Sequence, residues 1–332
     1  MPEHECLYYR PLPEGEVVCT LCPHACRLRE GESGRCRGRS VKAGKLYAAN
    51  YGRISALALD PIEKKPLYHF YPGTLILSVG TIGCNFTCRF CQNWQIAHQE
   101  VATDEMAPEE LVALALRWQP EGNIGIAYTY SEPLVWFDYI METARLAKDK
   151  GLKNVLVTNG YINPEPLATL IPYLDGVNLD LKGPEPFYQT YCGGSLAPVL
   201  KTAAQLAGRV HLEVTNLLLP GENDDEEDLT ALVRFLASLD RRIPLHFSRY
   251  FPQYQMRIPT TPLASLEKAF YLAKEELHYV YLGNIPDSGA FSNTFCPECG
   301  SLWVKRSGPT VTVAPFQEGC CLGCGREVDL LL

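Results

Sequence analysis

No hydrophobic run in the 332-residue sequence approaches the length that a bilayer requires, so we expect no membrane span. Residues 1–5 lack a basic stretch followed by an apolar one, so we expect no signal peptide and a cytoplasmic location. The net charge of −8 argues against a nucleic-acid partner. Repeats and low-complexity tracts are also lacking. These absences leave an ordinary globular chain, long enough to bury a large core.

Cysteine, by contrast, is abundant. The chain has 14 cysteines, and all but Cys6 and Cys192 fall into three tight groups. Disulfides are disfavoured in the cytosol, so grouping of this kind indicates metal ligation rather than crosslinking.

The middle group, Cys84, Cys88 and Cys91, supplies three thiolates from one short loop. A [4Fe–4S] cluster usually takes four cysteine ligands, so three would leave one iron open to a small molecule. Zinc prefers paired C-x2-C knuckles, which this loop does not provide. The C-x3-C-x2-C spacing, with Phe90 before the last cysteine, resembles the radical S-adenosylmethionine (SAM) signature. That resemblance implies a cluster that binds SAM and cleaves it reductively to a 5′-deoxyadenosyl radical.

Between about 61 and 290, short apolar β-branched runs alternate with stretches of helical periodicity. This alternation predicts an α/β fold with a parallel sheet and outer helices, which curls toward a barrel. Barrel chemistry collects at the carboxyl ends of the strands, and the cysteine loop follows the first run directly. The predicted strands lie near 74–80, 123–129, 153–158, 176–181, 210–217 and 243–249.

Polar side chains follow several of these strands. A carboxylate at the end of the second strand suits a ligand ammonium, and the polar groups after the third suit a ribose or carboxylate. Along the fourth strand, period-two alternation puts three polar residues on one face. The predicted cofactor-binding residues are Glu132, Thr158, Asn159, Asn178, Asp180 and Lys182.

The last cysteine group consists of two C-x2-C-G knuckles, Cys296/Cys299 and Cys321/Cys324. Each knuckle gives two tetrahedral ligands, so the pair predicts a zinc ribbon, with rubredoxin-like iron as the alternative. Cys320 is a spare thiol.

The first group, Cys19, Cys22, Cys26 and Cys36, follows a C-x2-C-x3-C-x9-C pattern. It matches neither a ferredoxin nor a ribbon, and it predicts a metal site that holds either zinc or a second iron–sulfur cluster. His24 can replace one thiol. The arginines and lysines around this group balance the thiolates or form a surface for an anionic partner.

The chain also resembles, over essentially its whole length, radical SAM enzymes close to pyruvate formate-lyase activating enzyme. More narrowly, it resembles the radical SAM member of the "AmmeMemoRadiSam" system. The matching segments are 22–26, 34–36, 60–70 (DPIEKKPLYHF), 91–94, 180–182, 220–224 and 283–284. The resemblance implies a partial (β/α)6 barrel at 61–290, between a cysteine-rich segment at 1–60 and a ribbon-like module at 291–332.

The resemblance also implies roles for single residues. Phe90 would lie beside the adenine of SAM, and Glu132 at its methionyl amino group. The glycines that precede this glutamate in the family are replaced here by Tyr130 and Ser131. Val157 stands where the activating enzymes have an aspartate, which puts a bound cation there in doubt.

The substrate is not defined by any motif. Candidate catalytic residues are His246, which would face the substrate, and Tyr250 and Cys192, either of which would quench a substrate radical. The alternatives for His246 are that it positions an electron donor or is a satisfied core residue, and the same alternatives apply to His69 and Glu213. The resemblance implies an electron donor such as ferredoxin or flavodoxin, and Memo-like and AMMECR-like partners. Activation of a glycyl-radical protein is the second enzymatic hypothesis, and a non-catalytic metal-binding scaffold is the third.

Overall fold

A central sheet organises the computed structural model, which describes residues 3–285 and 289–332. Its strand order within those ranges is β15-β14-β13-β12-β11-β10-β8-β7, and β7 alone runs antiparallel to its neighbour. The strands are β7 (Ala56–Pro61), β8 (Leu75–Gly80), β10 (Asn123–Tyr128), β11 (Lys153–Thr158), β12 (Gly176–Asp180), β13 (His211–Leu218), β14 (Leu245–Arg249) and β15 (Val280–Gly283).

The six predicted strands are therefore present, and the expected α/β class with a mostly parallel sheet is confirmed. Two further strands, β7 and β15, form the edges of the sheet. No backbone pairing joins these edges among the described residues, so the sheet is not a closed barrel. Because β7 begins at residue 56, the main sheet starts a few residues before the predicted boundary at 60.

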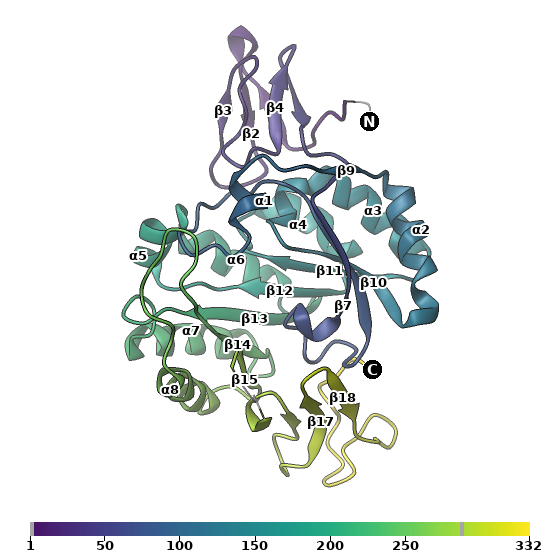
Figure 1. Cartoon of the computed structure of the whole chain (residues 1–332), viewed down its shortest axis with the longest axis vertical. Coiled ribbons are helices and arrows are strands. Elements are labelled where there is room, and N and C mark those ends of the chain that lie inside the picture. Colours follow the sequence, from purple (N-terminus) through teal and green to yellow (C-terminus); the bar gives the residue numbers. More distant parts are fainter. Residues whose placement is uncertain (1–2, 286–288) are drawn as a thin grey trace.

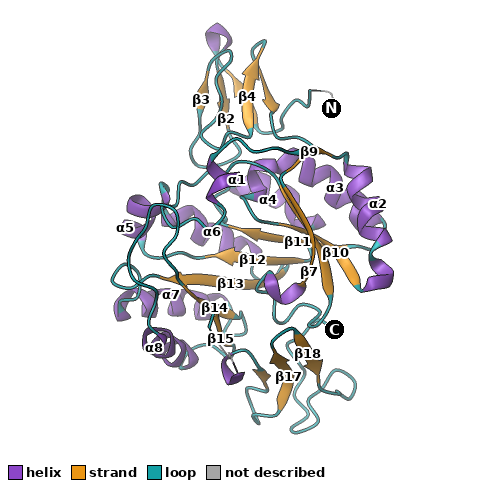
Figure 2. Cartoon of the chain, viewed as in Figure 1, coloured by secondary structure: helices purple, strands orange, loops and turns teal. Residues whose placement is uncertain are grey.

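Helices cover the outer face of the sheet (Figure 2). Helix α7 shows why they form: Asp225 caps its first turn through the backbone N–H of Glu227, and Leu229, Val233 and Leu236 bury one face. The longer helices are α2 (Pro108–Arg117), α3 (Phe137–Asp149), α4 (Pro164–Leu170), α6 (Leu196–Leu206), α7 (Glu226–Leu239) and α8 (Leu263–Lys274). Short helices α1 (Trp94–His98) and α5 (Glu185–Phe187) lie near the carboxyl ends of the strands. None of the described helices is both long and apolar enough to span a bilayer.

The N-terminal segment forms small antiparallel sheets at one end of the molecule (Figure 1). A buried ion pair fixes it to helix α3: Arg39 Nη2 lies 2.6 Å from Asp138 Oδ2, and both side chains are almost fully buried. The strands are β1 (Tyr9–Pro11), β2 (Val17–Cys19), β3 (Arg27–Leu28), β4 (Arg39–Lys42) and β5 (Lys45–Ala48), followed by β6 (Arg53–Ile54), which pairs with β9 (Asp104–Glu105).

The C-terminal module lies at the opposite end of the molecule (Figure 1) and contains β16 (Thr294–Phe295), β17 (Leu302–Ser307) and β18 (Thr310–Val313). The chain end returns to the connection between β7 and β8, where the Leu331 N–H donates to the His69 carbonyl at 2.8 Å. Arg306 also contacts the body of the protein, with its guanidinium 4.1 Å from the Tyr68 ring centre. The predicted boundary at 290 falls beside residues 286–288, which lie outside the described ranges.

Candidate functional site

A cavity of about 240 Å³ opens at the carboxyl ends of the parallel strands, where an α/β site is expected. The thiol-bearing loop forms one wall, and residues that follow the strands form the others. The lining includes Cys84, Cys88, Cys91, Phe90, Glu132, Asn159, Asp180 and Lys182. The structure thus brings together most of the residues that sequence reasoning assigned to the cluster and to SAM.

The cysteine loop enters the site through Gly83, whose φ is +94°. A β-carbon there would lie 2.3 Å from the Cys36 carbonyl oxygen, so only glycine fits. Burial raises the pKa of Cys84 well above its usual range and that of Cys91 to about 11. Thiolates at these positions therefore need positively charged partners, which iron ions supply.

The arrangement of the three thiols is compatible with a cluster. Cys84, Cys88 and Cys91 line the same cavity, and among the described residues they do not form a group placed to hold a single ion. A cluster with one thiolate on each of several irons holds its ligands farther apart than a single ion does. Three thiolates on one loop thus suit [4Fe–4S] better than zinc.

Glu132 joins the ends of β10 and β11. Its Oε1 accepts from the Thr158 hydroxyl at 2.5 Å and the Leu134 N–H at 2.9 Å, and its Oε2 accepts from the Asn159 N–H at 2.8 Å. Burial nevertheless raises the pKa of Glu132 to about 7, against the effect of these donors. Thr158 therefore acts on the site through Glu132 and not by lining the cavity itself.

Tyr130 lies two residues before Glu132, and its φ of 70° is one that glycine adopts more readily than tyrosine. Its hydroxyl donates to Asp60 Oδ2 at 2.8 Å, and Asn93 Nδ2 donates to its carbonyl at 2.6 Å. Asp60 also pairs with Lys65 at 2.9 Å. The acidic and basic residues of the 60–70 segment thus hold the backbone that leads to Glu132.

Asp180 and Lys182 form an ion pair of 2.7 Å on the cavity wall. Burial by itself would lower the pKa of Lys182, but Asp180 and the nearby thiols of Cys88 and Cys192 hold it well above its usual value. The lysine Nζ also lies 5.9 Å from the Phe90 ring centre. A fixed cation therefore stands beside the cysteine loop, where it can balance thiolate charge or pair with a ligand carboxylate.

Thr215, Ser248 and Asn284 also line the cavity, and none of them was given a role from the sequence, although 283–284 is among the matching segments. Thr215 lies in the second half of β13, Ser248 is the fourth of five residues in β14, and Asn284 follows β15. Asn284 Nδ2 donates to the Ser248 hydroxyl at 2.8 Å. Thr215 and Ser248 lie inside predicted strands, so their polarity near a strand end was the available signal. The Asn284 position depended on β15, which was not predicted.

Two predicted site residues lie behind the cavity. Asn178 is buried, donates to the Pro66 carbonyl at 2.8 Å and accepts from the Thr215 hydroxyl at 3.0 Å. Cys192 is fully buried against Cys88, and its carbonyl accepts from the Thr87 N–H at 2.8 Å. Both support the walls, and neither lines the cavity.

His246 does not face the cavity either, so its expected position at a strand end is wrong. It is the second residue of β14, and its Nε2 lies 2.6 Å from Glu213 Oε2. Glu213 Oε1 also accepts from the His69 N–H at 2.7 Å. The contacts therefore support the alternative interpretation, in which His246, His69 and Glu213 are buried residues that satisfy one another's hydrogen bonds. Tyr250, just after β14, is buried and also does not line the cavity.

The C-terminal cysteines form the tightest group. All four sulfurs lie within 4.8 Å of one another, with Cys296–Cys324 at 3.6 Å and Cys299–Cys321 at 3.7 Å. A tetrahedral ion with metal–sulfur bonds of about 2.3 Å separates its thiolates by about 3.8 Å. The four thiols are therefore placed to hold one metal ion. Cys320 stands outside the group.

These contacts describe an α/β domain whose three-thiol loop opens on a polar cavity at the carboxyl ends of the strands. Residues 78–233 match the family model of the Radical SAM superfamily. The chain therefore carries a radical SAM domain over those residues, which are just under half of its length.

A full-length relative is the "Uncharacterized protein MJ0808" of Methanocaldococcus jannaschii, which is 42% identical over 99% of both chains. The pyruvate formate-lyase-activating enzyme of Listeria monocytogenes is 27% identical over 47% of this chain and 67% of that enzyme. Among solved structures, a radical SAM methyltransferase from Sphaerobacter thermophilus shares the fold, with a TM-score of 0.51 at 17% identity over 70% of this chain and 71% of that one. The superfamily indicates an enzyme, and the matched region includes the cysteine loop, Glu132, Asp180 and Lys182 but not Ser248 or Asn284.

Proposed function

We propose that this chain is a radical SAM enzyme in which Cys84, Cys88 and Cys91 hold a [4Fe–4S] cluster with one iron left for SAM. The observation that carries the proposal is that the three thiols share one cavity with Glu132 and the Asp180–Lys182 pair. When bound, the cluster and SAM supply one-electron cleavage to a 5′-deoxyadenosyl radical, which abstracts hydrogen from a substrate.

The protein's own residues would bind and orient the cofactor. Glu132 is held rigidly by three donors and offers carboxylate charge at the cavity for the SAM ammonium. Lys182 offers a fixed cation for the carboxylate of SAM. Ser248 and Asn284, on β14 and after β15, offer hydroxyl and amide groups for the ribose. Phe90 offers an apolar face beside the adenine.

We further propose that the reaction belongs to a system with Memo-like and AMMECR-like partner proteins and modifies a small molecule or macromolecule. The support is the full-length resemblance, including the DPIEKKPLYHF segment, whose Asp60 and Lys65 brace the site through Tyr130. A one-electron donor such as ferredoxin or flavodoxin would reduce the cluster in the cytoplasm. The four C-terminal thiols would hold zinc in a ribbon-like module.

Glycyl-radical activation is a second candidate, favoured by the similarity to the Listeria activating enzyme. Incubation with the candidate protein substrate separates the two. A glycyl-radical signal in the electron paramagnetic resonance (EPR) spectrum supports activation, whereas a modified small molecule without that signal supports the first candidate.

The test of the common chemistry is production of 5′-deoxyadenosine by the oxygen-free protein with SAM and dithionite. We expect the Cys88→Ala variant to produce none above background, because the cluster then lacks one of three thiolates. Cys320→Ala is the matched control, and it should match the unmodified chain. An unchanged yield in Cys88→Ala would overturn the proposal.

A further inference from the structure

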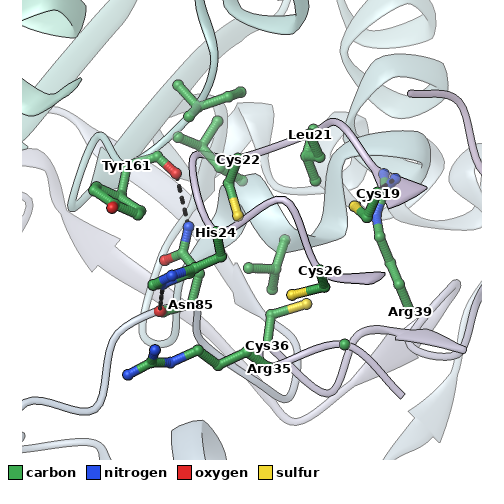
Figure 3. Close-up of a pocket in the computed structure, with 14 residues that line it drawn as sticks. Cys19, Leu21, Cys22, His24, Cys26, Arg35, Cys36, Arg39, Asn85 and Tyr161 are labelled. Atoms are coloured by element: carbon green, nitrogen blue, oxygen red, sulfur yellow. Dashed lines mark hydrogen bonds between the residues drawn. The ribbon is translucent and has the colours of Figure 1, made fainter. Parts of the chain in front are cut away.

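The N-terminal cysteines surround a second, smaller pocket. Figure 3 shows the thiols of Cys26 and Cys36 pointing toward one another and that of Cys22 toward the same space. Cys19 lies at the end of β2, and its N–H donates to the Cys26 carbonyl at 3.0 Å, which brings both ends of the loop to the pocket. The apolar lining comes from Leu21, Leu134, Val135 and Ile162.

The N-terminal thiols differ in arrangement from those of the C-terminal site. Among the described residues, only the C-terminal four form a group placed to hold a single ion, with all four sulfurs within 4.8 Å of one another. Neither the N-terminal cysteines nor Cys84, Cys88 and Cys91 form such a group, which is compatible with thiolates on separate irons.

The N-terminal pocket is also in direct contact with the cysteine loop. Asn85, the residue after Cys84, offers its carbonyl to His24 Nε2 at 2.7 Å, and His24 lies between Cys22 and Cys26. The Asn85 side chain accepts from Asn159 Nδ2 at 2.9 Å, and that same nitrogen lies 3.7 Å from Cys84 Sγ. A hydrogen bond thus connects the residue after Cys84 with His24, which lies two residues from Cys22 and two residues from Cys26.

A buried cation completes the pocket. Arg39 is almost fully buried, pairs with Asp138 at 2.6 Å, and places Nη1 4.0 Å from Cys19 Sγ. Positive charge beside thiolates stabilises a cluster's added electron, and the exclusion of solvent by an apolar lining also affects its reduction potential. A purely structural zinc needs neither contact with a redox loop nor a buried guanidinium.

We propose that Cys19, Cys22, Cys26 and Cys36 hold a second iron–sulfur cluster that passes electrons to the cluster at Cys84, Cys88 and Cys91. The transfer rests on the proposed function, but the site does not. One electron from a low-potential donor of the ferredoxin or flavodoxin class, or from dithionite, enters at the N-terminal cysteines. The same electron then moves to the loop cysteines, and no bond of the protein forms or breaks.

The test uses the full chain, reconstituted without oxygen with iron and sulfide. In the Cys84→Ala/Cys88→Ala/Cys91→Ala variant we expect about four irons and one zinc per chain, and an EPR signal from a reduced cluster. About two zincs and no iron above background would overturn the proposal. Should that variant fail to fold, the Cys22→Ala/Cys26→Ala/Cys36→Ala variant should retain about half the iron of the unmodified chain. An unmodified chain that holds about eight irons but makes no 5′-deoxyadenosine with SAM and dithionite would refute the proposed function and leave the second site standing.

Electron transfer between the sites has its own readout. In the fully reduced chain, two neighbouring unpaired spins broaden each other's EPR signals. We expect a spectrum that differs from the sum of the spectra of the two triple variants. A spectrum equal to that sum would overturn the relay.

Discussion

The cysteine groups at the two ends of the molecule share a C-x2-C start but differ in structure. In the C-terminal group, each knuckle is a tight turn: the Gly300 N–H donates to the Cys296 carbonyl at 3.0 Å, and the Gly325 N–H donates to the Cys321 carbonyl at 2.8 Å. Both glycines have positive φ, which lets the paired thiols converge. None of the N-terminal cysteines is followed by glycine, and these four do not form a group placed to hold a single ion. The turn after each cysteine pair is thus one local difference between the two ends of the molecule.

The two ends also differ in how they join the core. The N-terminal pocket is built partly from α3 and the cysteine loop, through Asp138 and Asn85. The C-terminal module has its own small core around Trp303 and Val304 and contacts the sheet through Tyr279 and Tyr281. The N-terminal site is therefore part of the catalytic body, whereas the C-terminal site is peripheral to it.

The largest predicted effect comes from removing the buried ion pair that attaches the N-terminal segment to helix α3. Asp138→Ala leaves Arg39 buried without its partner, so we expect a loss of about 3–5 kcal/mol in the free energy of unfolding, measured by denaturant titration. Glu100→Ala, which removes the exposed partner of Arg37, is the control and should cost less than about 1 kcal/mol. Equal losses in the two variants would show that the N-terminal end is not anchored by the buried pair.

A pH-dependent effect is expected at the C-terminal end. Burial lowers the pKa of His69 to about 4, while its Nδ1 contacts the Asp329 carbonyl at 2.7 Å. The unfolded chain binds this proton near pH 6.5 and the folded chain only near pH 4, so acidification across that window destabilises the fold, by up to about 3 kcal/mol. Unfolding of His69→Gln should depend less on pH between 6.5 and 4, whereas an identical pH profile would contradict this assignment.

The smallest expected effect is the effect of losing the C-terminal metal site on the production of 5′-deoxyadenosine. Cys299→Ser should lower the zinc content by about one ion per chain and expose the C-terminal module to protease. The yield of 5′-deoxyadenosine should stay within about twofold of the unmodified chain, since no described C-terminal cysteine lines the catalytic cavity. A loss as severe as that of Cys88→Ala would show that the module is not peripheral.

Much of this organisation follows from local sequence patterns. Strand-then-helix alternation located β8, β10, β11, β12, β13 and β14, and the cysteine spacings located three thiol groups. Strand ends were harder to place: the run 243–249 suggested that His246 ends a strand, but β14 begins at Leu245, so this histidine lies near its start. Period-two alternation identifies a face and not a distance along the strand.

Contacts between distant segments could not be read from the sequence. The edge strands β7 and β15 have pairing partners that only the folded sheet defines. Asn85 occurs within the cysteine motif, yet its contact with His24, 61 residues away in sequence, depends on how the N-terminal hairpin packs. The spread of the cysteine sulfurs is likewise a property of backbone turns and not of residue spacing.

The metal content of the unmodified chain, purified without oxygen and reconstituted, tests the central comparison most directly. Iron, sulfide and zinc would be quantified per chain on the same sample. We predict about eight irons, about eight sulfides and one zinc, with iron at the catalytic and N-terminal cysteines and zinc at the C-terminal ones. About four irons with two zincs would contradict the distinction drawn between the two ends of the molecule.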